Sequence, residues 1–335
     1  MAAVQHLQSP DLVPTLDVGY AWQPSANAAD LLDAPGTLAV IGFGAGPTAT
    51  HDDPRYLQVP LQATRNEACP LEVWRVDGPV ATGRDADVSW SVGGGYLMVA
   101  MRVGEDTHGG IRGAAEHAYH RLLDALADHD HPHLLRAWNY LADINAGDGD
   151  DERYRHFSIG RADGMAGLNS LTYPAATAIG RVDGVRELIV YAVAAKVPGQ
   201  PVENPRQVSA YRYPREYGPV SPSFARAMRL EMATPALLIS GTASVVGHAS
   251  LHDCADAQIA ETIRNLDSLV SSAQIGSHLP AASLLKAYVR HPADDAVVRD
   301  AIERHGLPAD RLICLHGDIC RSDLLLEIDG VSFLR

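Results

Sequence analysis

Short apolar runs broken by glycine, proline and aspartate interleave with a few amphipathic stretches, without the regular strand–helix–strand cadence of a doubly wound sheet. This irregular order limits the fold more than any other feature, and it favours the α+β class with mixed sheets and packed helices. Apolar runs that indicate strands lie at 37–43, 57–61, 71–76, 95–103, 133–144, 185–197, 235–246 and 279–289. Apolar residues at helical spacing predict helices at 113–128, 256–272 and 294–305.

The order of these elements suggests two fused units. Strands followed by a helix fill 36–130, and a longer mixture of strands and helices fills 185–335. No linker of distinctive composition separates the two, so the boundary is soft and falls somewhere in 145–185. We therefore expect an N-terminal α+β domain at 1–150 and a C-terminal domain at 151–335.

Charge and composition exclude several classes of partner. The 335 residues carry a net charge of −14, which disfavours nucleic acid or an anionic membrane surface. No run of 18 apolar residues occurs, and the start of the chain lacks the pattern of a secretory signal. The four cysteines are widely scattered. We expect a cytoplasmic protein.

Motifs for common cofactors fail on inspection. The glycines at 42–46 follow a strand but do not match GxGxxG, and no helix pattern comes after them. The acidic segment 143–154 has glycine and aspartate out of order for a calcium loop. The histidines at 117–133 lack metal-ligand spacing. We expect no metal and no cofactor.

One carboxylate lies in an apolar strand near the end of the chain. In the segment 324–331 (LLLEIDGV), strand alternation puts Leu325, Glu327 and Asp329 on one face. A buried carboxylate without a partner is costly, so a protein keeps one only where it is satisfied, neutralised or used. From the strand alone, a wet face and a catalytic acid are equally good interpretations of Glu327.

Two tyrosine–arginine pairs and a run of small residues are further candidates. Tyr154 and Arg161 bracket one segment, and Tyr213 and Arg226 bracket another. The run 240–244 (SGTAS) interrupts an apolar strand with small hydrogen-bonding residues. Each feature alone has an ordinary structural explanation. Together with a buried carboxyl group, the pairs would suit a small dianion, because guanidinium binds carboxylate bidentately.

Several longer segments resemble the chorismatase family. The segments are WNYLADINAGDGDDERYRHFSIGRADG, SAYRYPREYGPVSPSFARA, LLISGTASVVGH and DICRSDLLLEIDGV, and the similarity runs from about residue 90 to the end. The last segment also resembles the YjgF (reactive-intermediate deaminase) superfamily, matched here by Arg311 and Glu327. The resemblance implies a YjgF-like fold, with 151–335 as the catalytic domain. It leaves open a monomer or a homotrimer.

Carried over by position, the resemblance assigns roles to these residues. Glu327 matches the catalytic acid, and the substrate-binding set is matched by Tyr154, Arg161, Tyr213 and Arg226. Cys320 lies where the hydroxybenzoate-forming branch has a cysteine, so we expect it to steer the product, with Gly241 and Ala243 in the same wall. Whether Arg311 contacts substrate stays open.

The implied reaction converts chorismate to pyruvate and 3-hydroxybenzoate, with 4-hydroxybenzoate as a further possible product. One alternative is a chorismate hydrolase that gives dihydroxycyclohexadiene carboxylate. Another is an imine or enamine deaminase, or a non-catalytic module that binds a small anion. The paired anchors favour chorismate, since a monoacid needs only one.

Overall fold

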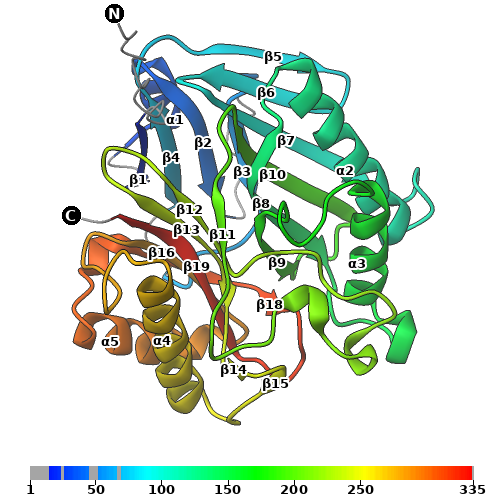
Figure 1. Ribbon diagram of the computed structural model, residues 1–335, viewed down its shortest axis with the longest axis vertical. Coiled ribbons are helices and arrows are strands. Elements are labelled where there is room, and N and C mark those ends of the chain that lie inside the picture. Colours follow the sequence, from blue (N-terminus) through cyan, green and yellow to red (C-terminus); the bar gives the residue numbers. More distant parts are fainter. Residues whose placement is uncertain (1–14, 24–25, 45–51, 66–68, 334–335) are drawn as a thin grey trace, which may run out of the picture.

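Three mixed β-sheets surround one central hydrophobic core, and helices cover their outer faces (Figure 1). The computed structural model describes residues 15–23, 26–44, 52–65 and 69–333. The central core takes apolar side chains from all three sheets, including Trp74, Trp138 and Tyr288. Three further apolar clusters lie between a sheet and its helices. No helix in these ranges is long and apolar enough to cross a membrane.

The first sheet has the strand order β1 (Leu16–Trp22), β4 (Pro70–Val76), β2 (Thr37–Phe43), β3 (Tyr56–Val59), and α1 (Ala28–Asp33) packs on it. The second sheet has the order β18 (Asp318–Ile319), β9 (Ala175–Arg181), β8 (His133–Ala142), β10 (Glu187–Ala195), β7 (Tyr96–Gly104), β6 (Val88–Gly93), β5 (Ala81–Asp85). Its outer face is covered by α2 (Ile111–Asp128) and α3 (Arg153–Gly164).

The third sheet has the order β11 (Gln200–Val202), β12 (Ala227–Leu230), β13 (Ala236–Thr242), β19 (Leu326–Phe333), β16 (Leu284–Val289), β17 (Leu312–His316). Its outer face is covered by α4 (Ala255–Ser272) and α5 (Asp295–Arg304). A hairpin of β14 (Val245–Val246) and β15 (Ala249–Ser250) follows β13. Residues 203–222 are irregular, as predicted, apart from the short 3-10 turns Ala210–Arg212 and Arg215–Tyr217.

The predicted α+β class with mixed sheets is confirmed. Three sheets share the central core, and the two-unit organisation stays a prediction. The sequence grouped β2, β3 and β4 with β7, whereas these strands belong to two different sheets. The domain division at residue 150 stays a prediction. Strands on both sides of it, β8 and β10, pair in one sheet.

The three predicted helices are present as α2, α4 and α5, but α3 was missed. The reason is that α3 has no apolar stripe, since it contacts α2 partly through glycines. A Cβ atom on Gly160 would lie 1.9 Å from the carbonyl oxygen of Arg112, and one on Gly164 would lie 2.6 Å from that of Glu116. Close backbone approach replaces the apolar periodicity that predicts a helix. This contact sets the place of Tyr154 and Arg161, which both lie on α3.

The C-terminal strand β19 lies inside the third sheet, between β13 and β16. Leu326 and Ile328 belong to the cluster beneath α4 and α5, so the alternate residues Glu327 and Asp329 face the other way. Glu327 is 5% exposed and Asp329 is 0% exposed. The wet-face interpretation of Glu327 is therefore wrong. Leu325 precedes the strand and does not belong to its alternation.

The glycine contact between α2 and α3 predicts a stability effect. We expect Gly160→Ala to lower the free energy of unfolding by about 1–3 kcal/mol, the usual cost of overpacking a tight contact. Thermal and urea unfolding measure this change. Gly19→Ala in β1 is the matched control, because a Cβ there meets no atom within 4 Å. Equal stability of the two variants would contradict the packing argument.

Candidate active site

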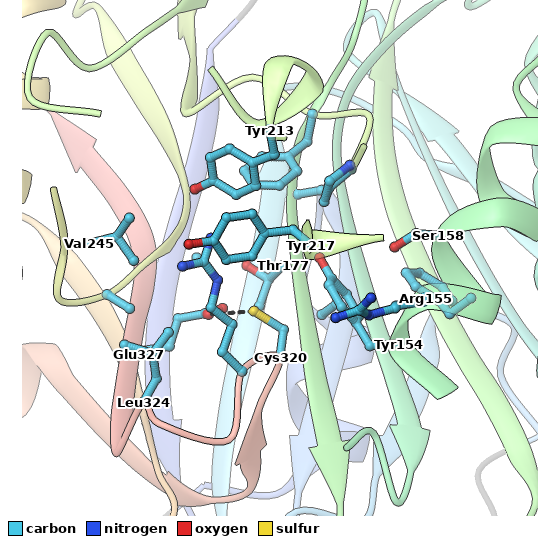
Figure 2. Close-up of a pocket in the computed structure, with 18 of the residues that line it drawn as sticks. Tyr154, Arg155, Ser158, Thr177, Tyr213, Tyr217, Val245, Cys320, Leu324 and Glu327 are labelled. Carbon is cyan, nitrogen blue, oxygen red and sulfur yellow. Dashed lines mark hydrogen bonds between the residues drawn. The ribbon is translucent and has the colours of Figure 1, made fainter. Parts of the chain in front are cut away.

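One cavity of about 330 Å³ brings together every site residue that the sequence predicted (Figure 2). Its walls come from α3, β9, the irregular segment before β12, the end of β13, and the chain from β18 into β19. The predicted residues that line it are Tyr154, Arg161, Tyr213, Arg226, Gly241, Ala243, Cys320 and Glu327. Figure 2 shows Tyr154, Arg155 and Ser158 on one side of the cavity and Glu327 on the other, with Cys320 between them. Arg311 is in the 3-10 turn Ala309–Arg311 and is not among the lining residues.

The small residues of the 240–244 run join two sheets at this point. The Ser240 hydroxyl accepts a hydrogen bond from the Ala176 backbone at 2.9 Å and donates one to the Ala225 carbonyl at 2.6 Å. These bonds hold β13 next to β9, at the edge of the second sheet. The pairing of β13 with β19 shifts register between Ile239 and Thr242. Gly241 lies in this irregularity and presents no side chain to the cavity.

Gly241 makes the space that the carboxyl group of Glu327 occupies. A Cβ atom on Gly241 would lie 1.9 Å from Glu327 Oε1 and 2.6 Å from its Cδ. On the other side, Cys320 Sγ lies 3.9 Å from Glu327 Oε2 and donates a weak hydrogen bond to it. The carboxyl group is therefore confined between a bare backbone and a thiol.

The site environment favours the protonated form of Glu327. Burial raises the pKa of Glu327 to about 8, and the negative charge of Asp329 acts in the same direction. Arg136, Arg226 and the Cys320 thiol oppose the increase, but burial outweighs them. A pKa of about 8 keeps the proton on this buried carboxyl group at neutral pH, which is what a proton donor requires.

Beneath Glu327 lies a group of four buried ionic residues, which we call the central ion cluster: Glu72, Arg136, Lys286 and Asp329. Their side chains are at most 2% exposed. Lys286 binds Glu72 and lies 3.5 Å from Asp329 Oδ1, and Arg136 Nη2 lies 3.2 Å from Asp329 Oδ2. No motif or spacing in the sequence predicted this cluster.

Arg161 keeps unused hydrogen-bond donors in the cavity wall. Its Nη1 donates to the Ser223 carbonyl at 2.8 Å, and its guanidinium lies over the Tyr119 ring at 4.8 Å. Its Nε and Nη2 are buried and have no hydrogen-bond partner within the part of the chain that the structure describes. Buried guanidinium donors without a partner are costly, so they suit an anionic ligand.

Arg226 is the second such cation. Its Nη2 donates to Tyr213 Oη at 2.6 Å and to the Val208 carbonyl at 2.9 Å. Its Nε is buried without a partner. The predicted pairing of Tyr213 with Arg226 is thus a direct contact. Tyr154 and Arg161 share α3 and line the same cavity.

Sequence reasoning missed several lining residues. Arg321 donates to the His248 carbonyl at 2.8 Å and stacks on Tyr217 with 4.0 Å between the guanidinium carbon and the ring centre. Arg155 lines the same cavity from α3, and Thr177 lines it from β9. Proximity to Cys320 could have drawn attention to Arg321, and Tyr217 lies within the segment that resembles the family. Arg155 likewise lies within a segment that resembles the family, whereas Thr177 lies outside those segments.

One cavity thus holds a buried carboxyl group of raised pKa and two arginines with unused donors, an arrangement that suits a small anionic ligand. Residues 72–194 match the family model described as Chorismatase FkbO/Hyg5-like, N-terminal. A chorismatase from Streptomyces rapamycinicus is 35% identical over 80% of this chain and 84% of its own length. The chain belongs to the chorismatase family.

Further comparisons agree with this assignment. A 3-hydroxybenzoate synthase from Streptomyces hygroscopicus is 33% identical over 85% of this chain and 87% of its own length. A crystal structure of a chorismatase matches with a TM-score of 0.85 and 30% identity, over 96% of this chain and 99% of that one. A YjgF-family protein from Neisseria meningitidis matches 35% of this chain and 91% of its own, with 19% identity and a TM-score of 0.28. The fold assignment rests on the chorismatase match, whose TM-score is far higher.

The contact between Gly241 and Glu327 generates a prediction. Gly241→Ala should displace the carboxyl group, because the added carbon would overlap Oε1. A displacement of about 1 Å at a reacting group costs about 10²-fold in rate, so we expect kcat for chorismate to fall by about that factor. Steady-state pyruvate release measures it, with Gly19→Ala as the control. Wild-type kcat in a folded Gly241→Ala protein would contradict the proposed confinement.

Proposed function

We propose that this chain converts chorismate to pyruvate and 3-hydroxybenzoate, with Glu327 as the acid that protonates the enolpyruvyl methylene carbon. The observation that carries the proposal is the carboxyl group itself, whose pKa is raised to about 8 where two arginines keep unused donors. The related 3-hydroxybenzoate synthase supports the product, and the related chorismatases support the substrate.

The chemistry follows from the weakness of carbon as a base. Chorismate is an enol ether, and its cleavage begins when a proton is added to the terminal methylene carbon. A carboxylic acid in a dry pocket suits this step, because its pKa lies near the working pH. After the transfer, the carboxylate of Glu327 stabilises the positive charge that develops on the ether carbon. An oxygen from water or from the neighbouring ring hydroxyl then adds to that carbon, and cleavage of a C–O bond releases pyruvate.

Two arginines match the two carboxylates of chorismate. Arg161 and Arg226 are 4% and 5% exposed, and each retains a buried donor without a partner. The hydroxyl of Tyr213 is fixed by Arg226, so it can direct a hydrogen bond to the same ligand group. An imine from a monocarboxylic acid would satisfy only one of these anchors. The alternative deaminase function therefore has less support from the cavity.

The product depends on which oxygen completes the reaction. If water attacks, one water molecule is consumed and the products are the dihydroxycyclohexadiene acid and pyruvate. Participation of the neighbouring ring hydroxyl gives hydroxybenzoate and pyruvate, which together contain only the atoms of chorismate. Burial raises the pKa of Cys320 to about 12, with Glu327 acting in the same direction. Cys320 is thus a neutral thiol that shapes the wall and excludes water, together with Gly241 and Ala243, rather than a nucleophile.

The acid role predicts a pH dependence and a variant phenotype. Because Glu327 must carry its proton, kcat/KM should be maximal below the pKa and fall as the pH rises through about 8. Glu327→Gln should bind chorismate with similar affinity yet lose about 10²–10⁴-fold in turnover, the usual contribution of a general acid. A lactate dehydrogenase assay follows pyruvate, and calorimetry follows binding.

Two outcomes of these experiments would contradict the proposal. Folded wild-type protein that releases no pyruvate from chorismate would refute the proposed reaction. Full turnover by Glu327→Gln would refute the proposed acid while leaving the substrate in place.

The steering role of Cys320 predicts a change in product ratio. Cys320→Ala enlarges the space beside Glu327, so water should enter and the dihydroxycyclohexadiene acid should increase at the expense of 3-hydroxybenzoate. Chromatography of the products measures the ratio and also detects any 4-hydroxybenzoate. Cys254→Ala is the matched control, because Cys254 is an exposed cysteine outside the cavity lining. An unchanged product ratio in Cys320→Ala would refute the proposed steering role of the thiol.

A further inference from the structure

Asp329 and Glu327 lie on the same face of β19, two residues apart. Asp329 forms ion pairs with Arg136 and Lys286, whereas Glu327 forms none with the described residues. Resting on the function proposed above, we infer that Asp329, held by the central ion cluster, is a positioning residue that keeps the proton on Glu327. Asp329 does not line the cavity, so it acts through Glu327 and not on the substrate.

Asp329 is fixed by neighbours from two sheets. Its Oδ2 accepts hydrogen bonds from Trp138 Nε1 at 3.0 Å, from Thr177 Oγ1 at 2.8 Å and from Tyr288 Oη at 3.1 Å. Arg136 adds an ion pair to the same oxygen at 3.2 Å. These contacts hold Oδ2, while Oδ1 lies 3.5 Å from Lys286 Nζ and has no hydrogen-bond partner among the described residues.

The rest of the central ion cluster balances the charge. Lys286 contacts Asp329 and binds Glu72, which also accepts hydrogen bonds from Trp74 at 2.7 Å and Tyr191 at 3.3 Å. Two cations thus face two anions. Glu327 would add a third negative charge with no cluster cation left for it. Burial then favours the neutral acid.

The other groups around Glu327 complete the electrostatic setting. Arg226, which precedes β12, lowers the pKa of Glu327, and Arg136 of the cluster acts in the same direction. Cys320, on the chain before β19, contributes its thiol. From α3, Tyr154 and Arg161 line the cavity. From β16, Tyr288 is the direct cross-strand neighbour of Glu327 and donates to Asp329.

Charge balance predicts the direction of change for each cluster variant. Asp329→Asn and Glu72→Gln each leave an excess cation, so Glu327 should release its proton at lower pH. Lys286→Met leaves an excess anion, so Glu327 should hold its proton to higher pH. The double variant Glu72→Gln/Lys286→Met removes one charge of each sign, and its titration should stay close to that of the wild type. A purely structural role would not produce opposite directions.

The experiment titrates Glu327 in unliganded full-length protein by infrared difference spectroscopy, with Glu327→Gln variants to identify its carboxyl band. We expect the midpoint to fall by about one pH unit or more in Asp329→Asn, because a neighbouring like charge is lost. We expect a smaller fall in Glu72→Gln and a rise in Lys286→Met. Circular dichroism and thermal unfolding establish which variants are folded. If Asp329→Asn does not fold, the midpoints of Glu72→Gln, Lys286→Met and their double variant test whether the charge balance sets the protonation of Glu327.

Unchanged midpoints, or shifts of the same sign in Glu72→Gln and Lys286→Met, would overturn the inference. The titration uses no substrate, so it is independent of the proposed reaction. Predicted shifts in a protein that releases no pyruvate from chorismate would support the charge balance and refute the function. Turnover of chorismate with unshifted midpoints would support the function and refute the role of Asp329.

Discussion

The ion pairs of the central ion cluster are the contact on which the arrangement of the three sheets depends. Glu72 comes from β4, Arg136 from β8, and Lys286 and Asp329 from β16 and β19, so each sheet contributes at least one charge. Removing four charges from water is expensive, and the attraction between them only partly offsets this cost. Tryptophan and tyrosine side chains donate to one oxygen of each carboxylate. A shift of one sheet would leave a buried charge unpaired, so the cluster favours one relative placement of the three sheets.

That placement creates the site. The cavity opens where β9 meets β13, and the hydroxyl of Ser240 holds those strands together. β19 passes beside this junction and presents Glu327 to the cavity and Asp329 to the core. Gly241 leaves room for the acid, and the close contact of α3 with α2 brings Arg161 to the opposite wall. The same strand therefore supplies both the proposed acid and the carboxylate proposed to control its protonation.

The residues that the sequence singled out line one cavity, and their catalytic roles stay predictions. Glu327 stood out as a carboxylate in an apolar strand, and resemblance to a family selected the tyrosines, arginines and Cys320 that the structure places around one cavity. The central ion cluster could not be predicted, because its members are brought together from four separate strands. In sequence, Lys286 in LLKAYV and Glu72 in PLEVWRV look like ordinary outward positions of half-exposed strands. The helix α3 was missed for a related reason, since its glycines hide a contact that only the folded chain reveals.

The central claim is that Glu327 donates a solvent-exchangeable proton to the methylene carbon of chorismate. The most direct measurement is to run the reaction in deuterium oxide, trap pyruvate at once as lactate with lactate dehydrogenase, and analyse its methyl group by mass spectrometry. The account predicts one deuterium in the methyl group for each turnover. A methyl group without deuterium would mean that the hydrogen comes from the substrate itself, and it would contradict the role of Glu327 as the carbon acid.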